Sequence, residues 1–168
     1  MKRLVLIDGN AILHRAYHAL PPLTNKKGAI VNAVYGFFSM FLKIVQDLKP
    51  EFVIVCFDRA APTFRKQLYV GYQAKRPKVA DDLVPQIGIV HDVLEKAKVA
   101  IFEVDGYEAD DIIGTLAFQA TSLKNQKSKI KNQKLETIIV SGDRDMLQLV
   151  NSHVEVLAPV KGITEMIL

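Results

Sequence analysis

The 168-residue sequence contains a single cysteine and no long hydrophobic run. One cysteine, Cys56, excludes an internal disulfide and is typical of a protein from a reducing compartment. Because Cys56 lies within an apolar, strand-like run, we expect it to be a small buried residue. The apolar run behind the N-terminal basic residues ends at Asp8 after four residues, so we expect neither an export signal nor a membrane span. These absences predict a cytosolic protein.

Ligands for zinc are also scarce. His14 and His18 are four residues apart, a spacing that places both side chains on one face of a helix and is able to bind zinc. No cysteine or further histidine follows nearby, so the sequence disfavours a zinc site.

The charge balance is modest, with 22 Lys and Arg against 18 Asp and Glu, a net charge of +4. This excess permits nucleic-acid binding without arguing strongly for it. About half of the residues (49%) are hydrophobic, which is enough to bury the core of one domain. We therefore expect residues 1–168 to form a single domain and the protein to be a monomer.

Apolar runs alternate with amphipathic segments along the chain. Runs typical of strands buried on both faces lie at residues 4–7, 52–57, 99–104, 135–140 and 154–157. Helical periodicity marks residues 12–20, 33–48, 85–97 and 112–120, with a short helix at 146–150. This alternation predicts an α/β, Rossmann-like three-layer domain around a central, mostly parallel sheet of about five strands.

Residues 164–168 show a different pattern, in which Thr164 stands before Glu165 and three apolar residues. The pattern predicts an N-cap followed by the first turn of a helix. A helix of four or five residues is not stable by itself. We therefore expect the sequence to be part of a longer protein.

Four of the apolar runs end in acidic residues. The seven carboxylates at these ends are Asp8, Asp58, Glu108, Asp110, Asp111, Asp143 and Asp145. Because the carboxyl ends of parallel strands lie at one edge of a sheet, where such sheets bind their ligands, we expect these side chains to lie close together. Helix capping is the alternative for each motif taken alone, since Asp and Glu in a first turn accept hydrogen bonds from free N–H groups.

Carboxylates within a few ångströms of one another cannot all ionise cheaply near neutral pH, so such a site takes up protons or binds cations. A cluster of oxygen ligands without cysteine suits the hard cations Mg²⁺ and Mn²⁺. Two ions about 4 Å apart are able to activate a water molecule and to stabilise the leaving oxygen in phosphodiester hydrolysis. The acidic turns therefore predict a metal site for that reaction.

Residues 59–82 differ in character from the rest of the chain. They contain six basic residues and three interleaved aromatic residues, with no acid before Asp81. Cations for phosphates and flat rings for bases are what a single-stranded nucleic acid requires. A solvated basic connection is the alternative, although more than twenty residues is long for a structural loop. A lysine-rich run at 124–134 is a second, weaker candidate for a nucleic-acid contact.

Two other functional classes remain open on these patterns. A dehalogenase-like phosphatase also places an acid after its first strand, but it needs a second Asp two residues later, where this sequence has Asn10. A non-enzymatic binding module on a parallel sheet is the other class. Such a module would need no acids gathered at one sheet edge and should take up no Mn²⁺.

Seven short motifs occur in an order that resembles the 5′-nuclease domain of bacterial DNA polymerase I, a member of the flap endonucleases and the wider PIN-like nucleases. They are residues 5–10 (VLIDGN), 15–19 (RAYHA), 33–36 (AVYG), 57–58 (FD), 63–65 (TFR), 106–111 (GYEADD) and 141–145 (SGDRD). The resemblance covers nearly the whole chain. It implies a Mg²⁺- or Mn²⁺-dependent 5′-to-3′ exonuclease and flap endonuclease that acts on DNA, including primers paired with DNA, in replication and repair.

The resemblance also implies roles for individual residues. All seven carboxylates would bind two or more metal ions, with Asp8, Asp58, Glu108 and Asp110 nearest one ion and Asp111, Asp143 and Asp145 toward the other. Residues 59–82 would form a helical arch over the reacting strand, and Arg65 and Arg76 would act at the scissile phosphate. Contacts with DNA are implied for Arg15, Tyr35, Arg65, Lys66, Tyr72, Gln73, Lys75 and Arg76.

The sequence departs from the family pattern in two ways. The family usually has Tyr-Lys-Ala-x-Arg in the arch, with the lysine near the scissile phosphate, whereas residues 72–76 read YQAKR and place Gln73 there. The family also continues into a further acidic pair and a helix-hairpin-helix element that grips duplex DNA. We therefore expect weak cleavage by residues 1–168 alone.

Overall fold

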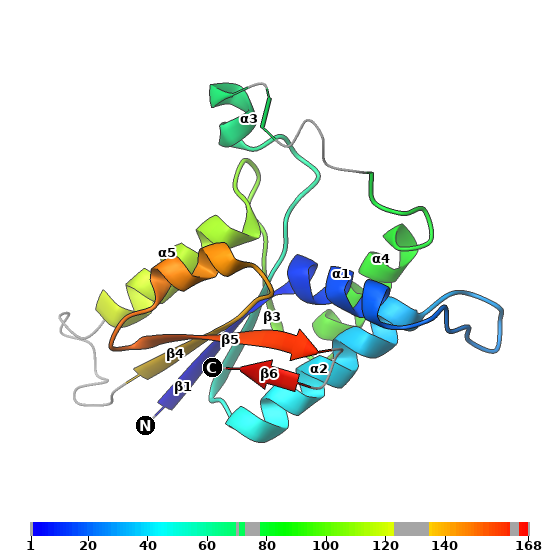
Figure 1. Cartoon of the computed structure of the whole chain (residues 1–168), viewed down its shortest axis with the longest axis horizontal. Helices are drawn as coiled ribbons and strands as arrows, with labels where there is room; N and C mark the ends of the chain where they lie inside the picture. Colours follow the sequence, from blue (N-terminus) through cyan, green and yellow to red (C-terminus); the bar gives the residue numbers. More distant parts are fainter. Residues whose placement is uncertain (1, 70, 73–77, 123–134, 162–164, 168) are drawn as a thin grey trace.

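The computed structural model describes the chain apart from residues 1, 70, 73–77, 123–134, 162–164 and 168. The described residues form one sheet of six strands in the order β3-β2-β1-β4-β5-β6 (Figure 1). The strands are β1 Lys2–Asp8, β2 Phe52–Cys56, β3 Ala100–Phe102, β4 Leu135–Val140, β5 Val154–Lys161 and β6 Glu165–Ile167. Strands β1 to β5 pair in parallel and β6 is antiparallel to β5, which confirms the predicted mostly parallel sheet.

Helices cover both faces of the sheet. They are α1 Gly9–Ala19, α2 Asn32–Leu48, α3 Phe64–Leu68, α4 Val84–Lys96, α5 Ala109–Ser122 and the 3₁₀-helix η2 Arg144–Leu149. Successive residues of a strand point to opposite faces. In β1, Val5 and Ile7 therefore join a core with α1, α2 and α4, while Leu4 and Leu6 join a second core with α5 and η2. The predicted three-layer α/β architecture is confirmed.

The central strands β1 and β4 are neighbours, with Ile7 paired with Val140 at their carboxyl ends. From β1 the chain builds outward through β2 and β3, and from β4 it builds the other way through β5. The order of strands thus reverses between β1 and β4. Open α/β sheets bind ligands beyond the strand ends at such a reversal.

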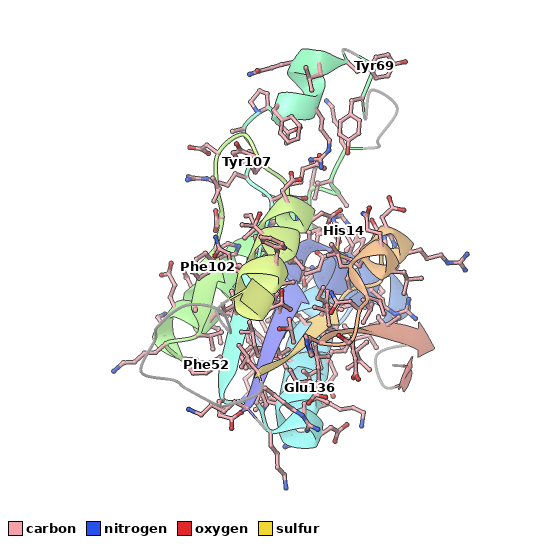
Figure 2. All side chains as sticks on the ribbon, turned by 90° about the vertical axis from the view of Figure 1, so that its left-hand side faces the viewer. His14, Phe52, Tyr69, Phe102, Tyr107 and Glu136 are labelled. Carbon is pink, nitrogen blue, oxygen red and sulfur yellow. The ribbon has the colours of Figure 1, made fainter. Side chains whose placement is uncertain are left out.

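Helix α3 lies beyond this edge of the sheet, apart from the helices that cover the two faces (Figure 1), and it belongs to the segment at residues 59–82. Figure 2 shows Tyr69 at the far end of this segment and Tyr107 nearer the sheet. The segment is anchored where the Phe64 N–H donates to the carbonyl oxygen of Gly106, at 3.0 Å. Gly106 has a φ of +85°, a conformation that glycine adopts without strain. The arch-like segment is therefore tied to the turn that leads into α5.

The predicted helix at residues 164–168 is wrong. Residues Glu165–Ile167 form β6, with Ile167 paired with Ala158 and Met166 with Pro159 of β5. A capping residue and three apolar positions carry too little periodicity to separate a helix turn from a strand. A strand is favoured over a helical turn here because it pairs with the free N–H and C=O groups along the edge of β5.

No helix within the described part of the chain has the length and apolar character needed to cross a membrane.

Candidate metal and nucleic-acid site

Asp8 stands at the end of β1 and is almost completely buried, at 4% exposure. One carboxylate oxygen, Oδ1, accepts a hydrogen bond from the Ala11 N–H at 2.9 Å and caps α1. The other, Oδ2, accepts from the Ser141 hydroxyl at 2.7 Å, just beyond β4. The Ser141 oxygen in turn accepts from the Asp143 N–H at 3.0 Å. Ser141 therefore joins the acidic turns that follow β1 and β4.

Asp58 is brought to the same place from β2. Its N–H donates to Asn10 Oδ1 at 3.0 Å, and its own Oδ1 accepts from the Ala109 N–H at 2.7 Å. The preceding residue, Phe57, packs its ring where a side chain on Gly9 would lie, since a Cβ there would be 2.4 Å from the ring. Glycine at position 9 thus permits the close approach of the β1 and β2 turns.

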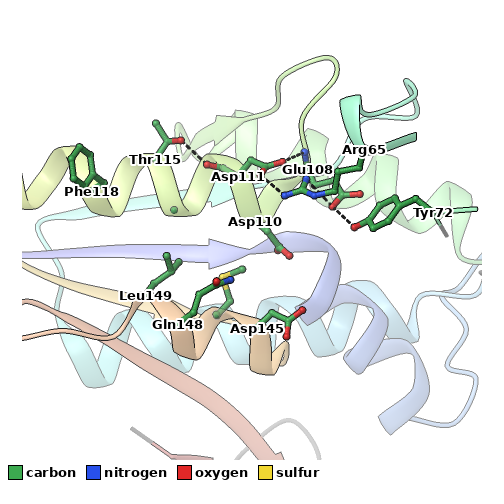
Figure 3. A pocket seen from close by; sticks show the side chains of 12 residues that line it. Arg65, Tyr72, Glu108, Asp110, Asp111, Thr115, Phe118, Asp145, Gln148 and Leu149 are labelled. Atoms are coloured by element: carbon green, nitrogen blue, oxygen red, sulfur yellow. Dashed lines mark hydrogen bonds and ion pairs between the residues drawn. The ribbon is translucent and has the colours of Figure 1, made fainter. Parts of the chain in front are cut away.

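Asp110 lies in the first turn of α5 and is partly buried. Burial raises its pKa from 3.8 to about 7, and the charges of Asp8, Asp143, Asp58 and Glu108 contribute in that order. The pKa of Asp8 is raised as well, chiefly by burial and further by Asp58 and Asp143. These four carboxylates, Asp8, Asp58, Asp110 and Asp143, form one mutually repelling set, which we call the acid group. Asp145 lies across the cleft from Asp110 (Figure 3).

The other two carboxylates of the GYEADD motif lie against the arch segment. Arg65 of α3 donates from Nη1 and Nη2 to the two oxygens of Asp111, both at 2.6 Å, and from Nη1 to Glu108 at 3.3 Å. The Tyr72 hydroxyl donates to Glu108 at 3.0 Å (Figure 3). The hydrogen bonds from Arg65 are the main reason that the pKa of Asp111 is lowered. We call Arg65, Tyr72, Glu108 and Asp111 the arch contact.

Asp110 of the acid group and the four residues of the arch contact line one cleft of about 530 Å³. Its acidic end is lined by Arg65, Tyr72, Glu108, Asp110, Asp111 and Asp145, and the cleft continues between α5 and η2 to Phe118 and Leu149. A second hollow of about 480 Å³ is lined by Ala11, Arg15, Gly142, Asp143 and Arg144. Cationic side chains therefore border the acids in both hollows, as a polyanionic substrate requires.

Among the described residues, no three His, Cys, Asp or Glu side chains are arranged as they stand so that they could hold a metal ion. Oxygens of Asp8, Asp58 and Asp143 instead accept hydrogen bonds from the chain's own N–H and O–H groups. The chemistry of the acid group still fits a divalent cation, because its ligands are all oxygen and because burial and its negative charges raise the pKa of Asp110.

The predicted DNA contacts that the structure describes lie at several separate places. Arg65 and Tyr72 lie in the arch contact, and Arg15 lines the second hollow. Lys66 is exposed on α3, and Tyr35 is 59% exposed on α2. Gln73, Lys75 and Arg76 lie outside the described residues, as does the lysine-rich run at 124–134.

The geometry departs from the implied partition of the seven acids. Asp111 lies with Glu108 and Arg65, whereas the Asp143 charge acts on Asp110 and Asp8. Sequence reasoning also missed two polar residues that hold the acids, Asn10 and Ser141. The available signal was their position in the same strand-end turns as the carboxylates.

The family description that matches this chain is "5'-3' exonuclease, N-terminal resolvase-like domain", over residues 3–167. The DNA polymerase I of Borreliella burgdorferi is 44% identical over 159 residues, which cover 94% of this chain and 16% of that protein. A 5'-3' exonuclease of Aquifex aeolicus is 37% identical over 159 residues, which cover 95% of this chain and 52% of that protein. The chain thus spans between about a sixth and about half of the length of these relatives.

Among solved structures, a bacteriophage T5 flap endonuclease complex with DNA and metal ions has the same fold, with a TM-score of 0.65. The match covers 94% of this chain and 55% of that one, at 17% sequence identity. The family match extends over nearly every residue that forms the sheet, the acid group and the arch contact. The chain therefore belongs to the family of 5'-3' exonuclease N-terminal resolvase-like domains.

Proposed function

We propose that this domain is the catalytic part of a nuclease that uses Mg²⁺ or Mn²⁺ to hydrolyse phosphodiester bonds of DNA at 5′ ends and flaps, including primer strands paired with DNA. The observation that carries the proposal is the acid group. Four carboxylates are gathered there from the ends of β1, β2 and β4 and from the start of α5, and burial together with the charges of the other three raises the pKa of Asp110 to about 7. Such a set binds a cation more readily than it holds four negative charges.

Asp8, Asp58, Asp110 and Asp143 would hold the metal ions, with Asp145 and Glu108 at the border of the site. Bound ions would activate the attacking water and stabilise the leaving oxygen. The chain's own contribution is to hold the acids in place before any substrate arrives. Ser141 and the Ala11 N–H fix Asp8, and the Ala109 N–H fixes Asp58. Groups positioned in advance need no reorganisation at the moment of reaction.

The arch contact would guide the strand toward the acid group. Arg65 lies at the border of the cleft with its guanidinium held in a fork, and Lys66 is exposed on the same helix. Both are suited to phosphate oxygens, and a planar fork binds phosphate with defined geometry. Tyr69, which is 69% exposed, offers an aromatic face for a base.

We expect residues 1–168 alone to cut slowly. Gln73 stands where the family pattern has a lysine, so one cation is missing from the arch. Loss of one charge-stabilising group commonly lowers a rate by about a hundredfold.

The test combines metal binding with cleavage. Titration with Mn²⁺ is expected to show binding that weakens at least about tenfold in Asp110→Asn. Asp47→Asn is the matched control, because Asp47 is exposed on α2 in an ion pair with Lys43. A 5′-labelled flap substrate in Mg²⁺ should be cut weakly by the chain and faster by Gln73→Lys.

Two outcomes would contradict the proposal. Equal Mn²⁺ affinity in the wild type and Asp110→Asn would mean that the acids serve as helix caps. Binding of the flap without metal-dependent cutting by the chain or by Gln73→Lys would favour a nucleic-acid-binding module.

A further inference from the structure

We propose that Asp111 is a positioning residue that holds Arg65 at the cleft, and that it does not bind the metal ions. The inference deepens the proposed function and rests on it. The resemblance of the sequence to nucleases implies the opposite assignment, with all seven acids as ligands. The geometry of the GYEADD motif separates Asp111 from the others.

Both oxygens of Asp111 are already engaged. Oδ2 accepts from the Glu108 N–H at 3.0 Å and from Arg65 Nη1 at 2.6 Å, and Oδ1 accepts from Arg65 Nη2 at 2.6 Å. The bond to Glu108 runs from the third residue of α5 back to the residue before the helix, which is the pattern of a capping box. Asp111 thus has a structural partner and a cationic partner before any metal binds.

Asp110 provides the contrast. Consecutive residues of a helix point about 100° apart around its axis. Asp110 accordingly lies toward the negative charges of Asp8 and Asp143, while Asp111 lies toward Arg65. Within the described part of the chain, Asp110 forms no ion pair with a basic side chain. Of these two adjacent acids, only Asp111 is paired with a cation among the residues that the structure describes.

A metal ion on Asp111 would have to replace the guanidinium. The fork of two short, charge-assisted hydrogen bonds is among the strongest arrangements that a carboxylate makes. The side chains are also partly shielded from water, at 30% exposure for Arg65 and 22% for Asp111. An ion placed there would also face the positive charge of Arg65 at short range, where the repulsion is large.

The same contacts leave Arg65 able to bind a substrate. A guanidinium has five N–H donors, of which the fork to Asp111 uses two and the bond to Glu108 uses a third. The guanidinium carbon lies 4.7 Å from the centre of the Phe64 ring, which limits its rotation. Arg65 lines the cleft together with Asp110 and Asp145. A phosphate held at the acid group would therefore meet an arginine whose orientation is already set.

Titration with Mn²⁺ separates the two roles. Asp110→Asn is expected to weaken Mn²⁺ binding at least about tenfold, whereas Asp111→Asn should change it by less than about twofold. Asparagine at position 111 keeps an oxygen that accepts from the Glu108 N–H, so the cap survives while the charge is removed. A loss in Asp111→Asn equal to that in Asp110→Asn would overturn the inference. No effect in either variant would refute the proposed metal site itself.

Arg65→Ala tests the same point without altering Asp111. If Asp111 is not a ligand, the affinity for Mn²⁺ should stay within a few-fold of the wild type. A rise of about tenfold or more would mean that Arg65 merely masks a metal ligand, and would overturn the inference.

Binding of a labelled flap oligonucleotide in Ca²⁺ supplies a second readout. Asp111→Asn and Arg65→Ala should each weaken binding about fivefold, and the double variant should be no weaker than Arg65→Ala alone. A double variant whose loss equals the product of the two single losses would show that Asp111 acts independently of Arg65. That result would also overturn the inference.

Discussion

Asp110 and Asp111 are adjacent in the sequence, but they lie in two regions with opposite electrostatics. In the acid group, burial and, after it, negative neighbours raise the pKa of Asp110 to about 7. In the arch contact, the hydrogen bonds from Arg65 lower the pKa of Asp111. Among the described residues, no ion pair joins the acid group to a basic side chain, whereas the arch contact contains its own cation. A run of carboxylates in a sequence is therefore not a single set of metal ligands, because the helix that begins there points their side chains in different directions.

The two regions also differ in what holds them. Asp8 and Asp58 of the acid group are fixed by backbone N–H groups and Ser141 at the ends of the strands, where two hydrophobic cores meet the sheet. The arch contact depends on side chains from a segment that stands apart from those cores. Changes to the arch should therefore leave the acid group intact.

The largest effect is expected from Asp8→Asn. Asparagine keeps an oxygen for the Ala11 N–H but removes a buried charge at the centre of the acid group. Mn²⁺ affinity should fall about a hundredfold, the upper part of the range for losses around a metal site. Titration calorimetry checks this, with Asp47→Asn as the control. An unchanged affinity would remove Asp8 from the metal site.

A smaller effect is expected in how the free energy of unfolding depends on pH. It should have opposite signs at Asp110 and Asp111. The folded pKa of Asp110 is above its ordinary value of 3.8, so the folded state binds more protons and loses stability as the pH rises through about 7. Asp110→Asn should therefore stabilise the fold at pH 8 by about 1–2 kcal/mol, a value discounted for solvent screening, and have little effect near pH 4.

Asp111 should behave in the reverse way. Its folded pKa is below 3.8, so its contribution to stability is present above that pH and is lost as the pH falls through the lower value. Asp111→Asn should cost about 0.5–1 kcal/mol at pH 8 and little at acid pH, again after discounting for exposure. Thermal unfolding of both variants at several pH values without metal measures this. If both variants shifted the free energy of unfolding in the same direction at pH 8, the opposite electrostatics of Asp110 and Asp111 would be contradicted.

The smallest effect concerns salt. Lys66 is exposed on α3 and is expected to contact a phosphate of a single strand. Lys66→Ala should therefore reduce the slope of log affinity against log salt by about 0.7 for single-stranded DNA. Lys43→Ala removes the same charge from the exposed face of α2 and should leave the slope unchanged. Equal slopes in the two variants would mean that α3 is only a solvated connection.

Much of the fold was predictable because its signals are local. Buried strands are recognisable in the sequence as short apolar runs. Parallel pairing of these strands brings the turns after β1, β2 and β4 to one edge of the sheet. Asp8, Asp58 and Asp143 were therefore expected to lie together. The helix expected at residues 164–168 failed because β6 exists only through pairing with β5, a long-range contact with no local signature.

The internal division of the site was harder to predict. Whether Asp110 or Asp111 faces the acid group depends on where α5 begins, and boundaries are the least certain part of a sequence-based assignment. The partner of Asp111 comes from a segment 46 residues away in the sequence. The bond between Ser141 and Asp8 spans 133 residues, and nothing in either turn alone indicates it.

The most direct test of the account is a crystal structure of this chain soaked in Mn²⁺, with anomalous scattering used to locate the ions. We expect Mn²⁺ between Asp8, Asp58, Asp110 and Asp143, with Arg65 still bound in a fork to Asp111. Manganese coordinated by Asp111, or an acid group without manganese at saturating concentration, would contradict it.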